Sequence, residues 1–95
     1  MDHNPKQERI NALYKLIVSI DNVEDCRALF EDMCTVKEVA NMAERCFAAK
    51  LLMEGNTYNQ VMAQADISSA TLSRVSRCVQ YGTGYRRVLA GEKKA

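Results

Sequence analysis

The chain has 95 residues, the length of one domain, and a formal net charge of +1 at pH 7. No apolar run approaches the roughly 18 residues that a membrane span requires, and the polar N-terminus lacks the apolar stretch of a secretory signal. We therefore expect one cytoplasmic domain without a membrane partner. Because so short a chain builds only a small core, oligomerisation is a reasonable expectation.

The residue types that support metal binding or catalysis are scattered. Four cysteines stand far apart at positions 26, 34, 46 and 78, and His3 is the only histidine. A zinc site needs closely spaced ligands, and no Ser/His/Asp or Cys/His set can be assembled. There is also no glycine-rich phosphate loop. The sequence predicts no metal site and no enzyme, and the cysteines are interpreted as small, mostly buried residues in a reducing compartment.

Charge is distributed unevenly along the chain. Residues 1–66 carry seven Lys or Arg against eleven Asp or Glu, a net of −4, whereas residues 67–95 carry six against one, a net of +5. This asymmetry is typical of an acidic scaffold with a basic face for a polyanion. A solvated basic tail is the alternative, and charge alone does not separate the two.

The pattern of apolar residues predicts an all-α protein of about six helices. The first helix is expected over about Pro5–Ser19, with an apolar stripe at three- and four-residue steps. Asp21 can cap the second helix, with Glu24 completing a box-like start. The predicted buried face of that helix consists of Val23, Cys26, Leu29, Phe30 and Met33.

The third predicted helix is long and apolar on two sides. Thr35 begins it with a capping box to Glu38, and it runs to about Glu54, where Gly55 forms a left-handed cap. A helix that is apolar on two sides is buried on two sides, which in a small chain indicates a partner subunit.

Three shorter helices are expected in the basic C-terminal part. A second capping box, Thr57 to Gln60, opens a helix that reaches about Ala65. Ser68 or Ser69 caps the next helix, whose inner face carries Leu72, Val75 and Val79 and which ends at Gly82 and Gly84. A last helix from Tyr85 to about Ala90 precedes a tail, residues 91–95, that is expected to be disordered.

The segment from about Thr57 to Gln80 has the pattern of a helix-turn-helix. Such a motif needs a tight turn between two short helices, followed by a capped second helix. Asp66 stands where a residue that tolerates positive φ is needed, Ile67 is the apolar plug and Ser68 the cap. The expected internal core consists of Val61, Ala65, Ile67, Leu72 and Val75. An ordinary αα-hairpin whose hydroxyl groups serve as caps is the alternative.

The second helix of this motif has an exposed face suited to DNA. Small or hydroxylated residues at its start permit close approach to base edges in the major groove, and arginines further along reach phosphate or guanine. The predicted DNA-binding residues on it are Ser68, Ser69, Ala70, Thr71, Ser73, Arg74 and Arg77. Tyr58 and Asn59, at the start of the preceding helix, are expected to touch the DNA backbone. Arg86 and Arg87 are expected to add phosphate contacts.

The stretch from Asp32 to Gly84 resembles the YerC/YecD-type relatives of the tryptophan repressor. The likeness is carried by CTVKEV, AERCFAAKLLMEGNTY and SSATLSRVSRCVQYG. The resemblance implies an intertwined all-α homodimer in which the first three helices exchange between subunits. It also implies a transcription regulator that reads a palindrome in double-stranded DNA with half-sites one helical turn apart.

The same resemblance raises the question of a small-molecule corepressor. Arg45 and Arg74 match the two arginines that sandwich tryptophan in the repressor, and Thr35 and Thr71 also match. Val75, however, replaces a glycine that leaves room for the indole ring. Arg45 is otherwise a surface ion-pairing residue and Arg74 a phosphate contact.

Three functions follow as hypotheses. The leading one is a sequence-specific, dimeric DNA-binding regulator, a repressor, without a required cofactor. The second is a repressor gated by a tryptophan-like amino acid held between Arg45 and Arg74. The third is a helix-turn-helix fold used as a protein-interaction or dimerisation module, which predicts weak, salt-insensitive association with DNA.

Overall fold

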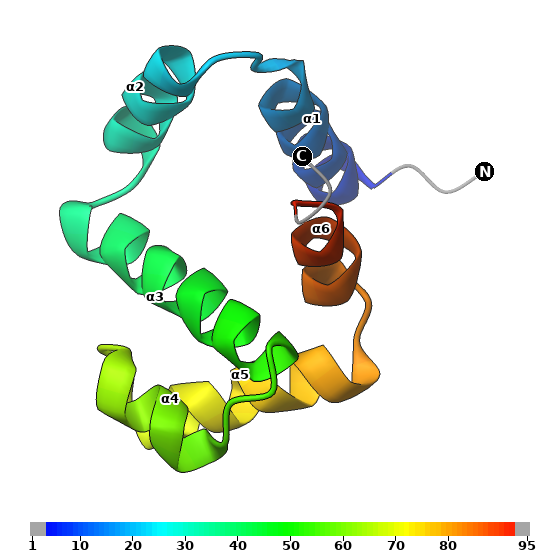
Figure 1. Cartoon of the computed structure of the whole chain (residues 1–95). Helices are drawn as coiled ribbons and strands as arrows, with labels where there is room; N and C mark the ends of the chain where they lie inside the picture. The colour runs from blue at the N-terminus through cyan, green and yellow to red at the C-terminus, as the bar shows by residue number, and fades with distance from the viewer. Residues whose placement is uncertain (1–3, 93–95) are drawn as a thin grey trace. The chain divides into compact units, whose positions relative to one another are not determined.

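The computed structural model describes residues 4–92, which form six α-helices and no strand (Figure 1). The helices are α1 (Pro5–Ser19), α2 (Val23–Met33), α3 (Val36–Met53), α4 (Tyr58–Gln64), α5 (Ser69–Tyr81) and α6 (Gly84–Glu92). The all-α prediction is therefore confirmed. Among the described residues, no helix is both long and apolar enough to cross a membrane. The chain divides into two units, one up to Val36 and one from Lys37 onward, and each is described by itself.

In the first unit both helices begin at an asparagine. The Asn4 side chain accepts hydrogen bonds from the backbone N–H groups of Lys6 and Gln7, and Pro5 occupies the first helical position. Asn22 caps α2 by accepting from the Asp25 N–H at 2.8 Å. The prediction that Asp21 caps α2 is wrong by one residue. Its carboxylate instead accepts from the Asn22 side-chain amide at 3.0 Å, so it helps hold the cap.

Neither helix of the first unit contains a buried residue. Of the face predicted to be buried in α2, Cys26, Leu29 and Phe30 are half-buried, and Val23 and Met33 are exposed. On α1, Val18 is 83% exposed. The apolar stripes exist as predicted, but within one chain they remain in contact with solvent, because helices of 15 and 11 residues do not enclose a core of their own.

Helix α3 ends as the sequence predicts, at a glycine in the left-handed region. Gly55 has φ +97°, and its N–H donates to the Leu52 carbonyl at 3.1 Å. The Asn56 N–H donates to the Leu51 carbonyl at 3.1 Å. These two bonds form a Schellman motif, which satisfies carbonyls that the helix end would otherwise leave unpaired.

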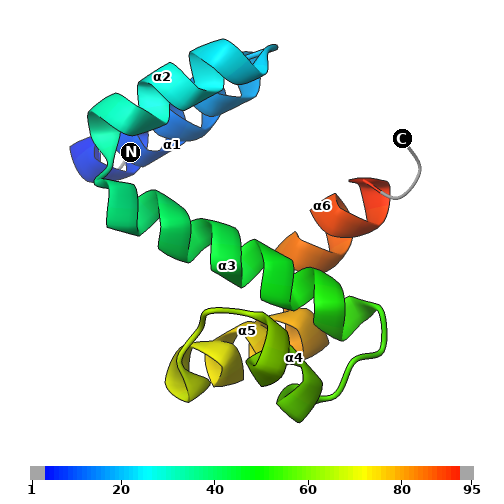
Figure 2. The same ribbon diagram turned by 60° about the vertical axis from the view of Figure 1, so that its left-hand side comes forward.

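The core lies in the second unit, where the C-terminal half of α3 meets α4 and α5 (Figure 2). Its buried residues are Ala48, Ala49, Leu51, Val61, Ala65, Leu72, Val75 and Val79. The N-terminal half of α3 is different: Val36 is 90% exposed, and Val39 and Met42 are also exposed. One face of α3 is thus covered by its own chain, while most of its N-terminal apolar surface is not.

Helix α6 is longer than the sequence predicts. It begins at Gly84, one residue before the predicted start at Tyr85, and continues to Glu92, two residues beyond the predicted end at Ala90. Residues 93–95 lie outside the described part of the chain. Glycine weakens a helix interior by about 1 kcal/mol, which does not by itself end a helix.

Candidate nucleic-acid interface

Helix α4 begins with the predicted capping box. The Gln60 N–H donates to the Thr57 hydroxyl oxygen at 3.2 Å, and the Thr57 N–H donates to the Gln60 side-chain oxygen at 2.7 Å. Two backbone donors at the helix start are therefore satisfied reciprocally. The box makes Tyr58 the first residue of α4, so its ring lies at the N-terminal end of that helix.

The turn between α4 and α5 is built differently from the prediction. No non-glycine residue between positions 4 and 92 has a positive φ, so Asp66 does not adopt the left-handed conformation expected of it. The chain turns through extended residues instead, Ala65 at φ −103°, ψ 146° and Ser68 at φ −72°, ψ 156°. The Glu44 carboxylate of α3 accepts the Asp66 N–H at 2.8 Å, which holds the turn without backbone strain.

Ser68, rather than Ser69, caps α5. Its hydroxyl oxygen accepts from the Thr71 N–H at 3.1 Å and donates to the Thr71 hydroxyl at 3.0 Å. Thr71 is half-buried, although the sequence predicts it to be exposed. The Ser68 and Thr71 hydroxyls are therefore engaged with each other at the start of α5.

The two faces of α5 separate as the sequence predicts. Leu72 is fully buried, Val75 is 2% exposed and Val79 is 6% exposed. Ile67 is half-buried and packs against the same core. The outer, solvent-exposed face carries Ser69, Ala70, Ser73, Arg74 and Arg77. Small polar groups therefore stand near the N-terminal end of the exposed face, and guanidinium groups follow.

Tyr58 makes a contact with α5 that the sequence does not predict. Its hydroxyl donates to the Ser69 carbonyl at 2.7 Å and lies 3.3 Å from the Ser73 hydroxyl. It therefore joins the start of α4 to the outer face of α5. No local pattern signals this contact, because its partners are 11 and 15 residues away along the chain. The neighbouring Asn59 is exposed.

The basic residues after α5 differ in their surroundings. The Arg86 Nε donates to the Val79 carbonyl near the C-terminal end of α5, so its guanidinium is tied to the helix that precedes it. Arg87 is exposed. Arg86 therefore serves the junction of α5 and α6, a role that its sequence position does not indicate.

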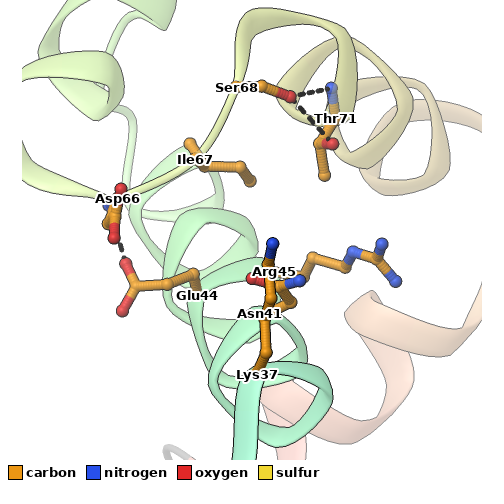
Figure 3. Close-up of a pocket in the computed structure, with 8 residues that line it drawn as sticks. All are labelled: Lys37, Asn41, Glu44, Arg45, Asp66, Ile67, Ser68 and Thr71. Carbon is orange, nitrogen blue, oxygen red and sulfur yellow. Dashed lines mark hydrogen bonds between the residues drawn. The ribbon is translucent and has the colours of Figure 1, made fainter.

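A pocket of about 490 Å³ lies between α3 and the turn before α5 (Figure 3). Its lining residues are Lys37, Asn41, Glu44, Arg45, Asp66, Ile67, Ser68 and Thr71. Of the predicted ligand-binding residues, Arg45 lines it and Arg74 does not; Thr35 belongs to the first unit. Only Ile67 on this wall is apolar, whereas a preformed pocket for an aromatic ring is mostly apolar.

A second pocket, of about 480 Å³, is apolar and lies beside α6. Its lining residues are Cys46, Cys78, Gly82, Gly84, Tyr85, Val88 and Leu89. Burial raises the pKa of Tyr85 above its ordinary value of 10.0, and the neighbouring Cys46 and Cys78 raise it further; Arg45 and Arg74 act in the opposite direction.

The cysteines are less buried than the sequence predicts. Cys46 is exposed, and Cys26, Cys34 and Cys78 are half-buried. Within residues 4–92, no three or more His, Cys, Asp or Glu side chains gather where they could hold a metal ion.

Comparison with known proteins gives consistent matches over most of the chain. A family model described as Trp repressor protein matches residues 8–93. The uncharacterized protein YerC of Bacillus subtilis is 39% identical over 75 residues, which is 79% of this chain and 72% of YerC.

Solved structures show the same likeness. The crystal structure of a candidate Trp repressor from Staphylococcus aureus is similar with a TM-score of 0.85 and 32% identity, over 90% of this chain and 87% of that one. A TrpR-like protein from Eubacterium eligens has a TM-score of 0.84 and 33% identity, over 90% of each chain.

Proposed function

Because the chain belongs to the Trp repressor family, a family of helix-turn-helix regulators rather than enzymes, we propose that it is a sequence-specific DNA-binding repressor. It acts as a homodimer and inserts α5 into the major groove of each half of a palindromic operator. The supporting observation is the outer face of α5, which is open to solvent along its length while its inner face is buried. A recognition helix needs this combination, because it must be held rigidly and still reach base edges.

The residues on the outer face of α5 have different roles in DNA binding. Ser69, Ala70 and Ser73 are short, so the start of the helix can approach the bases closely. Arg74 and Arg77 reach outward to guanine or phosphate, and phosphate contacts supply most of the sequence-independent affinity. Asn59 extends the surface from α4 toward the DNA backbone.

The dimer is supported by apolar surface that one chain leaves uncovered. Val18 on α1 is 83% exposed, Val23 on α2 is 66% exposed and Val36 on α3 is 90% exposed. Large apolar groups left exposed on three successive helices are typical of a chain that buries them against a partner. A second copy of the chain would bury them and set the two α5 helices at a fixed spacing.

The direct test is a random-sequence binding selection followed by titration of the selected duplex at several salt concentrations. We expect a palindromic consensus and salt-dependent binding. Arg77→Ala should weaken binding to all duplexes and lower the salt slope by about one unit. Arg9→Ala, at an exposed position on α1, is the matched control and should leave the slope unchanged. Weak association that does not respond to salt would contradict the proposal and favour a protein-interaction module.

A second candidate function is gating by an amino acid, and the polar pocket is the observation that favours it. Lys37 and Arg45 supply cations to the pocket lining and Glu44 and Asp66 supply carboxylates, a set suited to a zwitterion. Calorimetry with tryptophan and with polar amino acids, on the native chain and on Arg45→Ala, tests it. Heat that is lost in the variant supports gating, and no heat with any amino acid contradicts it.

A further inference from the structure

The Tyr58 hydroxyl has one proton and two neighbours. It lies 2.7 Å from the Ser69 carbonyl oxygen and 3.3 Å from the Ser73 hydroxyl oxygen. A carbonyl oxygen can only accept. The Tyr58 proton is therefore directed to Ser69, which also gives the shorter of the two hydrogen bonds.

The Ser73 hydroxyl must then supply the proton of its own bond with Tyr58. The Tyr58 oxygen keeps its lone pairs as acceptors once its proton is committed to Ser69. In the described part of the chain, the bond with Tyr58 is the only hydrogen bond of the Ser73 hydroxyl. The Ser69 carbonyl, four residues earlier on the same helix, accepts the Ser73 backbone N–H through the helical pattern and the Tyr58 hydroxyl besides, so both of its lone pairs are used.

Ser73 thus presents lone pairs, and no free proton, on the outer face of α5. We propose that Ser73 reads DNA as a hydrogen-bond acceptor, accepting a hydrogen bond from the exocyclic amino group of adenine or cytosine. In the major groove those amino groups are the donors, whereas guanine O6 and N7 and thymine O4 only accept. Phosphate oxygens also only accept. This inference rests on the proposed function, since it assigns a base preference to one residue of the recognition helix.

The expected base preference differs from the usual classes of base preference, so a binding selection can identify it. On the strand that Ser73 faces, adenine and cytosine should be favoured over guanine and thymine. This division separates amino from keto bases; it is neither purine against pyrimidine nor A·T against G·C. A hydroxyl free to rotate, which can donate or accept, would not impose it.

Ser69 provides an internal comparison on the same face. It is exposed, and no hydrogen bond of its hydroxyl is found between residues 4 and 92. Its hydroxyl can therefore donate or accept as a base demands. The chain thus contains one serine whose proton is held by a tyrosine and, one helical turn earlier, one whose proton is free.

The experiment is a random-sequence selection on the full chain and on Ser73→Ala, Tyr58→Phe and Ser69→Ala. The base-pair position of the consensus whose preference changes in Ser73→Ala is the one that Ser73 contacts. At that position the native chain should select adenine or cytosine, and Tyr58→Phe should also accept guanine and thymine, because Ser73 is then free to donate. Ser69→Ala should leave the amino preference at that position intact.

A duplex with a base analogue that lacks the amino group at that position supplies the quantitative test. Its affinity for the native chain should fall about three- to tenfold, the effect of one hydrogen bond, and its affinity for Ser73→Ala should not change. Circular dichroism checks that each variant is folded. Ser73→Ala does not touch the Tyr58–Ser69 bond, so the amino-group result does not depend on the folding of Tyr58→Phe.

The possible failures are distinguishable. A native preference for guanine or thymine at that position, or a consensus that Ser73→Ala leaves unchanged, overturns the inference while the proposed function stands. A preference that Tyr58→Phe retains in a folded variant also overturns it. A selection that returns no consensus for the native chain contradicts the proposed function itself.

Discussion

Gly82 and Gly84 stand two residues apart between α5 and α6, and only one of them has a steric reason to be glycine. A Cβ on Gly82 would lie 2.7 Å from the backbone carbonyl oxygen of Cys78, which cannot move aside. That carbonyl also accepts the Gly82 N–H at 2.8 Å, so the close approach belongs to the end of α5. A Cβ on Gly84 would meet nothing within 4 Å.

We therefore expect opposite effects from the two alanine substitutions. Gly82→Ala should lower the free energy of unfolding by about 1–3 kcal/mol, because the new methyl group forces the backbone to shift. Gly84→Ala, at the first residue of α6, should be neutral or stabilising by up to about 1 kcal/mol, since alanine favours the helix. Urea denaturation measures both, and equal losses would refute the steric explanation.

Tyr85 lies at the apolar pocket beside α6, where ionisation is unfavourable. Burial is the main cause of its raised pKa, and the neighbouring Cys46 and Cys78 add to it. The folded state therefore holds this proton more tightly than the unfolded state does.

The sign of the pH dependence follows from that difference. The contribution of Tyr85 to stability is fully present below pH 10 and is lost as pH rises through the raised pKa of Tyr85. We expect thermal stability to fall more steeply in this range for the native chain than for Tyr85→Phe. Tyr81→Phe, at a residue that is 83% exposed, is the control and should follow the native chain. Identical slopes in all three proteins would contradict the assignment.

At the level of elements, the helix-turn-helix is attached to α3 by a hydrogen bond to a side chain of α3 as well as by the shared core. Glu44 is half-buried on α3, and its carboxylate accepts the N–H of Asp66 in the turn. This contact links positions 22 residues apart and lies on the wall of the polar pocket. The contact therefore helps to set the orientation of α5 relative to α3.

Substitution of Glu44 tests this attachment. Glu44→Ala removes the acceptor and should lower the free energy of unfolding by about 0.5–1.5 kcal/mol. It should also speed hydrogen exchange of the Asp66 amide, because that N–H then faces water. Glu44→Gln keeps an acceptor oxygen at the same place and should retain most of the protection. Exchange that is equally fast in both variants would show that the negative charge, rather than the acceptor, holds the turn.

At the level of the whole molecule, the proposed homodimer would cover apolar residues that a single chain leaves exposed. Met42 is 37% exposed in the middle of α3, and α1 and α2 contribute no buried residue. A chain that completes its core with a second copy has a stability that depends on its concentration.

We expect the thermal midpoint to rise with protein concentration. Met42→Lys, which keeps a good helix former but places a charge on the apolar face, should weaken self-association at least tenfold in sedimentation equilibrium. Asn41→Lys adds the same side chain at the neighbouring polar position and should leave self-association unchanged. A midpoint independent of concentration would contradict the dimer.

Much of the secondary structure follows from residues that act locally. Pro5, the Thr57–Gln60 box and Gly55 mark helix ends through interactions within a few residues, and each is confirmed. The inner face of α5 is also confirmed, since its apolar residues recur at helical spacing. The predicted cap of α2 is one residue from the observed cap, because Asp21 and Asn22 have similar capping ability.

The sequence alone determined the helices, the helix-turn-helix and its exposed hydroxyl and arginine residues. It could do so because caps and apolar periodicity act over one or two helical turns. The tertiary structure alone decided that the Glu44 carboxylate accepts the Asp66 N–H, that the Ser68 hydroxyl bonds to that of Thr71, and that the Tyr58 hydroxyl lies 3.3 Å from that of Ser73. The contacts of Glu44 and Tyr58 join different helices, and even the Ser68–Thr71 pair depends on which of two adjacent serines becomes the cap. A hydrogen bond depends on distance and direction in space, which spacing along the chain does not specify.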